Sequence, residues 1–121
     1  MFEKLTKPPI KTEKPWGYEL LWAQTKDYVA KILFVKSGES LSLQYHLEKE
    51  ETLYLKEGEC LFEYGLKEGE LEKQVLKSGS VFHIPPGLIH RMNAISDCLF
   101  FEVSTPQLSD VVRLKDNYGR T

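Results

Sequence analysis

Residues 38–58, GESLSLQYHLEKEETLYLKEG, decide the fold class of this chain. Apolar and polar residues alternate on both sides of a charged middle segment, and on a β-strand residues two apart share a face. The first half divides into Leu41, Leu43 and Tyr45 on one face, and Ser40, Ser42, Gln44 and His46 on the other. In the second half Glu51 shares a face with Leu53 and Leu55. The stretch therefore predicts two amphipathic strands joined by a polar turn.

The rest of the chain continues this pattern of short apolar runs separated by turns that contain glycine. The strands that it predicts are Tyr18–Ala23, Tyr28–Lys36, Ser40–His46, Glu51–Lys56, Glu59–Tyr64, Leu71–Leu76, Val81–Ile84, Ile89–Ile95 and Asp97–Ser104. Many short strands joined by such turns favour an all-β antiparallel sandwich or barrel. A parallel α/β fold would need helices that the pattern does not contain.

The two ends of the chain are less strand-like. Lys7–Lys14 contains two prolines and is predicted to be an extended arm, and Ser109–Thr121 a short turn or an irregular strap over the barrel. A length of 121 residues is typical of one domain. We expect a single domain over residues 1–121, with an N-terminal arm at 1–15 and a C-terminal strap at 109–121. Exposed sheet edges often pair across chains, so we also expect a homodimer, with the arm as the candidate exchanged strand.

Composition and charge exclude several classes of protein. Hydrophobic residues make up 41% of the chain, and 6 Phe, 6 Tyr and 2 Trp are too many aromatics for a disordered chain. A net charge of −2 without long charged runs gives no reason to expect a nucleic-acid partner. We find no apolar run long enough to span a membrane and no secretory signal, and therefore expect a cytoplasmic protein. Cys60 and Cys98 lie in strand-like runs and are predicted to be buried thiols without a disulfide.

Several polar residues lie on strand faces that should point into the core. Glu51 is one, Lys31 and His90 share faces with apolar neighbours, and Gln44 and His46 lie together on the polar face of their strand. A buried carboxylate is costly unless it is paired, protonated or bound to a metal. If a barrel closes around these side chains, two imidazoles, a carboxylate and an amide oxygen can bind a divalent cation. The alternative, which periodicity leaves open, is that the polar faces simply meet solvent.

The spacing of these residues resembles the two sequence signatures of the cupin family. The first reads Gly, five residues, His-x-His, three or four residues, Glu, six residues, Gly, and here comprises Gly38, Gln44, His46, Glu51 and Gly58. The second reads Gly, five residues, Pro-x-Gly, two residues, His, three residues, Asn, and here comprises Gly79, Pro85, Gly87 and His90, with Asn93 one place early. The resemblance implies a jelly-roll β-barrel, or double-stranded β-helix, with a metal inside.

Residues outside the signatures resemble the C-terminal cupin domain of type II phosphomannose isomerases. These are Lys14–Gly17, Leu41–Gln44, Ile84–Gly87 with His90–Arg91, Asp110–Arg113 and Asp116–Arg120. Those enzymes hold zinc with a Gln-x-His pair, a Glu and a later His, which correspond here to Gln44, His46, Glu51 and His90. The resemblance implies metal-dependent interconversion of mannose 6-phosphate and fructose 6-phosphate, or of a related sugar. Zinc is the first expectation, with Mn, Co, Ni and Fe as further candidates.

Isomerisation of a sugar phosphate needs a polarised carbonyl, a base that moves a proton between adjacent carbons, and a cationic site for phosphate. Because the four metal ligands are engaged, Lys31 and Glu102 are the candidate proton carriers. Arg113 and Arg120 are the candidate phosphate ligands, since guanidinium groups bind phosphate through paired donors.

Two other functions remain open. The chain could be a cupin that binds a metal or a sugar without chemistry. It could also be an iron-dependent oxygenase, because His46, Glu51 and His90 alone provide two histidines and one carboxylate.

Overall fold

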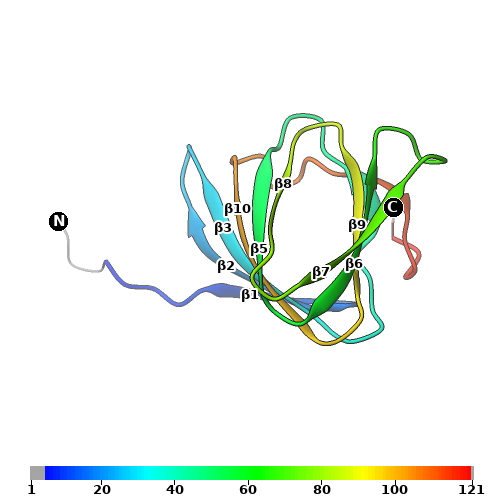
Figure 1. Cartoon of the computed structure of the whole chain (residues 1–121). Coiled ribbons are helices and arrows are strands. Elements are labelled where there is room, and N and C mark those ends of the chain that lie inside the picture. Colours follow the sequence, from blue (N-terminus) through cyan, green and yellow to red (C-terminus); the bar gives the residue numbers. More distant parts are fainter. Residues whose placement is uncertain (1–4, 121) are drawn as a thin grey trace.

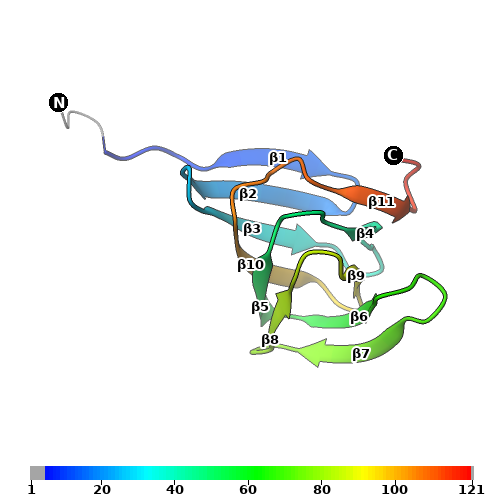
Figure 2. The same cartoon turned by 90° about the horizontal axis from the view of Figure 1, so that it is seen from above.

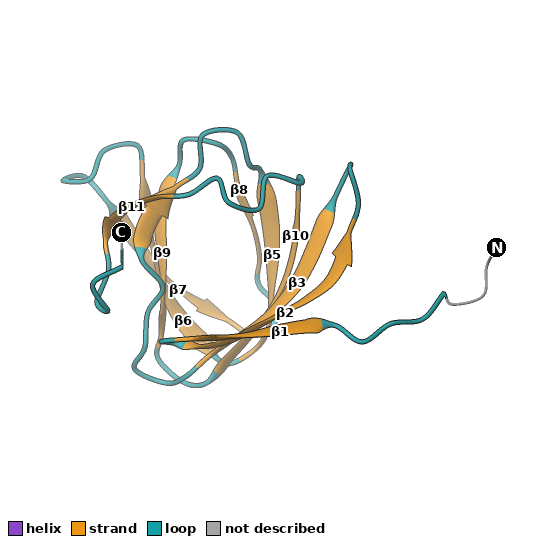
Figure 3. Cartoon of the chain, turned by 180° about the vertical axis from the view of Figure 1, so that it is seen from behind, coloured by secondary structure: helices purple, strands orange, loops and turns teal. Residues whose placement is uncertain are grey.

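The computed structural model describes residues 5–120 and contains only β-strands, turns and loops over that range (Figure 3). The eleven strands are β1 (Ile10–Lys14), β2 (Gly17–Gln24), β3 (Val29–Val35), β4 (Leu43–Tyr45), β5 (Glu51–Glu57), β6 (Glu59–Gly65), β7 (Glu72–Lys77), β8 (Val81–Ile84), β9 (Ile89–Ala94), β10 (Cys98–Ser104) and β11 (Val112–Lys115). The all-β prediction is confirmed. The described chain has no helix that could cross a membrane.

The strands form two antiparallel sheets that face each other as the two walls of a barrel (Figure 1). Sheet A has the order β1-β2-β3-β10-β5-β8, and sheet B the order β11-β4-β9-β6-β7. Strands far apart in the sequence are neighbours in both sheets, as β3 and β10 are in Figure 2. This arrangement is the jelly-roll barrel that the sequence signatures imply.

The hydrophobic core fills the space between the two sheets. Alternate residues of β5 and β10 are buried, as their two-residue periodicity predicts. The buried cluster comprises Trp16, Leu33, Val35, Leu41, Leu53, Leu55, Cys60, Phe62, Leu76, Ile84, Met92, Ala94, Cys98 and Phe100. Both cysteines are buried free thiols, so that prediction is confirmed.

Each of the nine strands predicted from the sequence is present, but one is much shorter than expected. β4 covers only Leu43–Tyr45 instead of Ser40–His46. Before Leu43 the chain leaves the regular ladder, because Ser40 forms only an isolated bridge with Asn93. The predicted alternation therefore fails here, because Ser40 and Ser42 of the expected polar face are buried as well as Leu41 and Leu43 of the apolar face.

Both chain ends contain a strand that the sequence pattern did not predict. Within the expected arm, β1 pairs along its whole length with β2 of the same chain. Within the expected strap, β11 pairs with β4. β1 has one apolar residue, and β11 alternates over only four residues, none of them fully buried. Each strand adds to the edge of a sheet through backbone hydrogen bonds. Residues 1–4 of the arm and Thr121 of the strap lie outside the described residues.

The signature residue Gly58 shows why the β5–β6 turn requires glycine. Its φ is +100°, a conformation that other residues rarely adopt. A Cβ atom at this position would also collide with the carbonyl oxygen of Asp97. The turn can therefore pack against the start of β10 only without a side chain.

Candidate metal centre

Three ligand-type side chains converge inside the barrel near one of its ends. Glu51 begins β5, His46 follows β4 directly, and His90 lies in β9. Their ligand atoms all lie within 4.8 Å of one another, and all three residues are buried. The Nε2 atoms of His46 and His90 are each 3.7 Å from Oε1 of Glu51. The sequence prediction that these residues share one interior position agrees with this geometry.

Backbone carbonyl groups determine how the two imidazole rings are oriented. His46 Nδ1 lies 2.6 Å from the carbonyl oxygen of Asp110, and His90 Nδ1 lies 2.9 Å from that of Leu88. A carbonyl oxygen can only accept a hydrogen bond, so both Nδ1 atoms donate, and in the neutral imidazole each Nε2 atom keeps its lone pair. Among the described residues neither Nε2 atom has a hydrogen-bond partner. Buried lone pairs directed toward a carboxylate oxygen fit a divalent cation, and the carbonyl groups supply the outer hydrogen bonds usual for metal-bound histidines.

Gln44, the fourth predicted ligand, lies beside this cluster. It is directly opposite His90 in the pairing of β4 with β9 and lines the same pocket as His46 and Glu51. Its Oε1 accepts a hydrogen bond of 2.8 Å from the hydroxyl of Ser42. A second lone pair on the same oxygen leaves Gln44 able to complete a four-ligand site.

A pocket of about 120 Å³ opens next to the cluster. All four residues proposed for proton transfer and phosphate binding line it: Lys31, Glu102, Arg113 and Arg120. Lys31 comes from β3 and Glu102 from β10, so both belong to the inner face of sheet A. The arginines come from the C-terminal strap. The structure thus brings together every site residue expected from the sequence.

The structure adds Lys49, which sequence analysis missed. The residue is only 5% exposed, and its Nζ lies 3.0 Å from Oε2 of Glu51 and 3.3 Å from Oε2 of Glu102. Lys49 therefore holds one oxygen of Glu51 while the other oxygen faces the histidines. Its position two residues before an inward-pointing glutamate was the only available signal. Glu19 was also missed, and it pairs with Lys31 at 3.1 Å.

Burial and charge set the protonation states within this group. Burial alone would raise the pKa of Glu51, but His46 and the Lys49 ammonium outweigh burial and lower it to about 2. Burial lowers the pKa of His90, which favours the neutral, metal-binding imidazole. Burial raises the pKa of Glu102, and the charge of Glu51 adds to the effect. Burial opposes the charge on Lys49, but Glu102 and Glu51 raise its pKa, so the ammonium stays charged.

Asp110 connects the C-terminal strap to the segment that follows His46. Its carboxylate accepts hydrogen bonds from the backbone N–H groups of Leu47 (3.0 Å), Glu48 (2.7 Å) and Lys49 (2.9 Å). Its backbone carbonyl accepts the His46 Nδ1–H described above. One residue of the strap thus positions both the histidine ring and the loop that carries Lys49.

The strap also places the two arginines at the pocket wall. Arg113 lies opposite Gln44 in the pairing of β11 with β4. Arg120 donates from Nε and Nη2 to the two carboxylate oxygens of Asp116, at 3.1 and 2.9 Å. This bidentate ion pair orients the Arg120 guanidinium. It also occupies two of the N–H donors that were expected to bind the phosphate group.

Comparison with known proteins identifies the family. The sequence profile described as Cupin matches residues 18–116, and this chain belongs to the cupin family. None of the curated proteins searched matches the chain. Among solved structures it is similar to the capsular polysaccharide assembling protein CapF from Staphylococcus aureus, with a TM-score of 0.79 and 16% identity over 96% of this chain and 37% of CapF.

Two further structures share the fold. KdgF from Halomonas sp. has a TM-score of 0.69 and 22% identity over 83% of this chain and 88% of KdgF. Oxalate decarboxylase from Bacillus subtilis, a protein with Mn(II) centres, matches over 93% of this chain and 32% of its own length, with a TM-score of 0.77 and 18% identity. This chain therefore spans about a third of the length of CapF and of the decarboxylase. At these identities the likeness concerns the fold.

Proposed function

We propose that this protein is a metal-dependent sugar-phosphate isomerase of the mannose-6-phosphate isomerase type. We propose further that it acts in the cytoplasm, in nucleotide-sugar or polysaccharide metabolism. One observation carries the proposal: two buried imidazole nitrogens without hydrogen-bond partners converge with a carboxylate oxygen beside a pocket lined by arginines. The donor set suits a divalent cation, and the cationic wall suits an anionic substrate.

His46, Glu51 and His90 would hold the metal, with Gln44 as the fourth ligand. Zinc suits this combination of imidazole, carboxylate and amide oxygen, and Mn, Co, Ni or Fe could also occupy it. When bound, the metal would polarise the carbonyl group of the substrate.

Glu102 is the better placed of the two candidate proton carriers. It is 5% exposed at the pocket wall, and burial raises its pKa, which makes the carboxylate a stronger base. In the proposed reaction it takes a proton from one carbon of the open-chain sugar and returns it to the neighbouring carbon. Lys31 is the second candidate, and each of the two has an ion-pair partner: Glu19 lies 3.1 Å from Lys31, and Lys49 lies 3.3 Å from Glu102.

The strap arginines would bind the phosphate group. Arg113 and Arg120 line the same pocket as Glu102 and Gln44, so a small substrate could reach both the metal and the guanidinium groups. The bidentate ion pair with Asp116 already restricts the Arg120 side chain, so this side chain loses less conformational entropy when a ligand binds.

The ligand cluster itself also favours a second function. Two histidines and one carboxylate form the set that holds non-haem iron in many oxygenases. If Gln44 keeps its hydrogen bond with Ser42 and does not bind the metal, three protein ligands remain. The first experiment must therefore separate isomerisation from oxygen chemistry.

The test begins with the metal content of the purified protein, measured by elemental analysis. Metal-free protein is then loaded with Zn, Mn, Co or Ni and assayed for interconversion of mannose 6-phosphate and fructose 6-phosphate, and of other hexose phosphates. The same protein loaded with ferrous iron is assayed for oxygen consumption. We expect metal-dependent isomerisation and no oxygen uptake.

The chain offers a matched control for the metal site. His90→Ala should abolish both metal binding and turnover, whereas His83→Ala should change neither, because His83 is exposed and pairs with Glu50. Glu102→Gln should retain the metal and lose turnover. Metal or sugar binding without turnover would identify a non-catalytic binding protein, and oxygen uptake would identify an oxygenase.

A further inference from the structure

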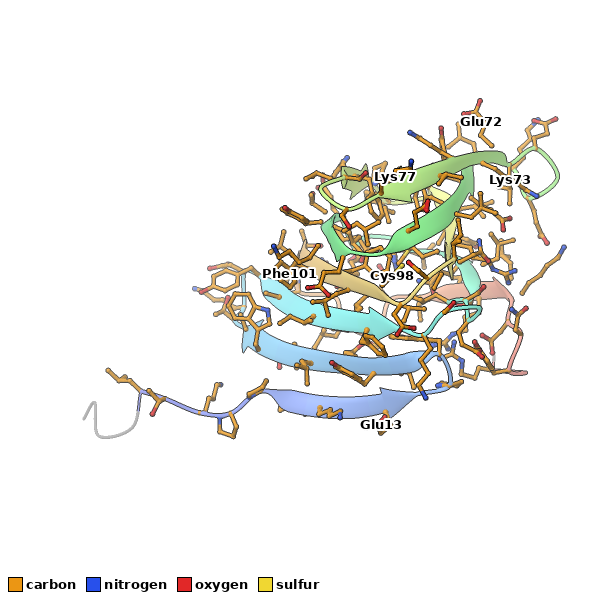
Figure 4. The ribbon with its side chains drawn as sticks, turned by 60° about the horizontal axis from the view of Figure 1, so that its bottom comes forward. Glu13, Glu72, Lys73, Lys77, Cys98 and Phe101 are labelled. Atoms are coloured by element: carbon orange, nitrogen blue, oxygen red, sulfur yellow. The ribbon has the colours of Figure 1, made fainter. Side chains whose placement is uncertain are left out.

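The outer face of sheet A carries an apolar row across five neighbouring strands. Strand register places five side chains in line across the sheet, in the order Leu20, Ile32, Phe101, Tyr54 and Val81. They alternate with the inward-pointing residues, so the row lies on the side of the sheet away from the pocket. Phe101 is 39% exposed, Tyr54 41% and Val81 63%. Figure 4 labels Phe101 beside the sheet A strands.

The rows beside this one are apolar over β3 and β10 and end on polar residues of β5 and β8. In one direction along the strands, Val103 pairs with Ala30 and is 55% exposed. In the other, Leu99 pairs with Phe34, whose ring stacks on that of Tyr18 at 5.2 Å. Charged groups lie at the two edges of the face, where they contact a neighbour in their own chain, and at the end of β5, where Lys56 and Glu57 are exposed. These edge pairs are Lys11 with Glu13 and His83 with Glu50.

The outer face of sheet B shows what a solvated face of this protein looks like. There one row across β7, β6 and β9 consists of Lys73, Glu63 and Arg91, whose charges alternate in sign. Glu59 faces Lys77 in the next charged row, and Figure 4 shows Lys73 and Lys77 along β7. The two faces come from the same fold, so the apolar character of sheet A is a property of that face rather than of small barrels in general.

The apolar area of this face is similar to the apolar area that each partner buries in a homodimer. From the exposed fractions of its side chains, its accessible apolar area is on the order of 500 Å². A standard interface buries about 800 Å² on each partner, and about 65% of a homodimer interface is apolar, which corresponds to roughly 500 Å². The two areas agree.

We infer that a second copy of this chain covers the outer face of sheet A, through face-to-face packing of the two sheets about a two-fold axis. A two-fold interface brings the same patch against itself, which excludes patches that carry a net charge. Here the centre of the patch is uncharged, and Lys56 and Glu57 at the end of β5 carry opposite charges. The interface uses the sheet face, so it does not require exchange of β1, which pairs with β2 in its own chain.

Sedimentation or light scattering of the full chain tests the inference over micromolar concentrations. The wild-type protein should have twice the 14.0 kDa mass of the chain. Tyr54→Lys, in the middle of the apolar row, should shift the protein to a monomer. Phe101→Lys should do the same, and circular dichroism with thermal unfolding shows whether each variant is folded.

Val75→Lys is the matched control, because Val75 is 50% exposed on the outer face of sheet B and should leave the dimer intact. A monomeric wild-type protein, or a dimer that persists in folded Tyr54→Lys, overturns the inference. The first result would leave the face to a partner of another kind, and the second would indicate dimerisation through strand edges. Metal binding should not change in Tyr54→Lys, since Tyr54 points away from the pocket, so this test is independent of the proposed function.

Discussion

Replacement of Lys49 by methionine tests the charge balance inside the barrel. Lys49 is the buried cation between Glu51 and Glu102, at 3.0 and 3.3 Å. Methionine keeps most of its volume and removes the charge, which leaves two buried carboxylates without their shared counter-ion. Loss of one partner from a buried ion pair costs about 3–5 kcal/mol. For a chain of this length, that corresponds to a melting temperature about 12–20 °C lower.

Chemical and thermal unfolding of the metal-free protein, with a chelator present, measure this loss directly. A chelator is needed because a bound cation would offset the charge of Glu51 and reduce the effect. The deficit should also shrink as the pH falls, because burial raises the pKa of Glu102 and its protonated form needs no counter-ion.

The double variant Lys49→Met/Glu102→Gln separates charge balance from lost packing. It leaves one buried carboxylate instead of two, so it should be more stable than the sum of the two single changes predicts, by about 0.5–3 kcal/mol. A destabilisation of less than about 1 kcal/mol in Lys49→Met, which is the size of an exposed ion pair, would refute the reasoning. Additive single changes would refute it as well.

Three further outcomes follow from the contacts around the site. Asp110→Asn replaces the carboxylate oxygen that accepts from Glu48 and Lys49 N–H with a donor, which disturbs the strap residue whose carbonyl orients His46. In calorimetry it should weaken metal binding about 10- to 100-fold. Asp97→Asn, the same change at a distant turn where Oδ1 accepts from Ser37 N–H, should leave metal binding unchanged. Because burial lowers the pKa of His90, metal affinity should persist as the pH falls to 6.5, the ordinary value for histidine, and decline below it; a loss that is complete at pH 6.5 would contradict this assignment. Burial raises the pKa of Cys60 to about 12 and that of Cys98 to about 11, so neither thiol should react with a thiol reagent in the native state at neutral pH. Since an unfolded cysteine ionises near 9.0, the free energy of unfolding should fall as the pH rises from 9 toward these values.

The inward-pointing residues of regular strands were predictable from sequence. Glu51 and His90 alternate with apolar residues in β5 and β9, and both are buried as expected. Glu102 also lies on the buried face of its strand. The prediction succeeded here because side-chain direction in a strand depends only on the local backbone, which repeats every two residues.

The same reasoning failed where the backbone is irregular. Lys49 lies in the polar turn between β4 and β5, outside any regular strand, and it was overlooked although it is among the most buried charged residues. β1 was not recognised as a strand because it has a single apolar residue, and β11 because its alternation covers only four residues.

By itself the sequence determined that the chain is an all-β cupin and which strand residues point inward, because both follow from short-range periodicity and fixed spacing. Only the tertiary structure decided which polar groups meet. The contact of Lys49 with Glu102 spans 53 residues of sequence, and that of His46 with Asp110 spans 64. Such contacts depend on how the two sheets and the strap pack together, and this packing cannot be predicted from the local sequence pattern.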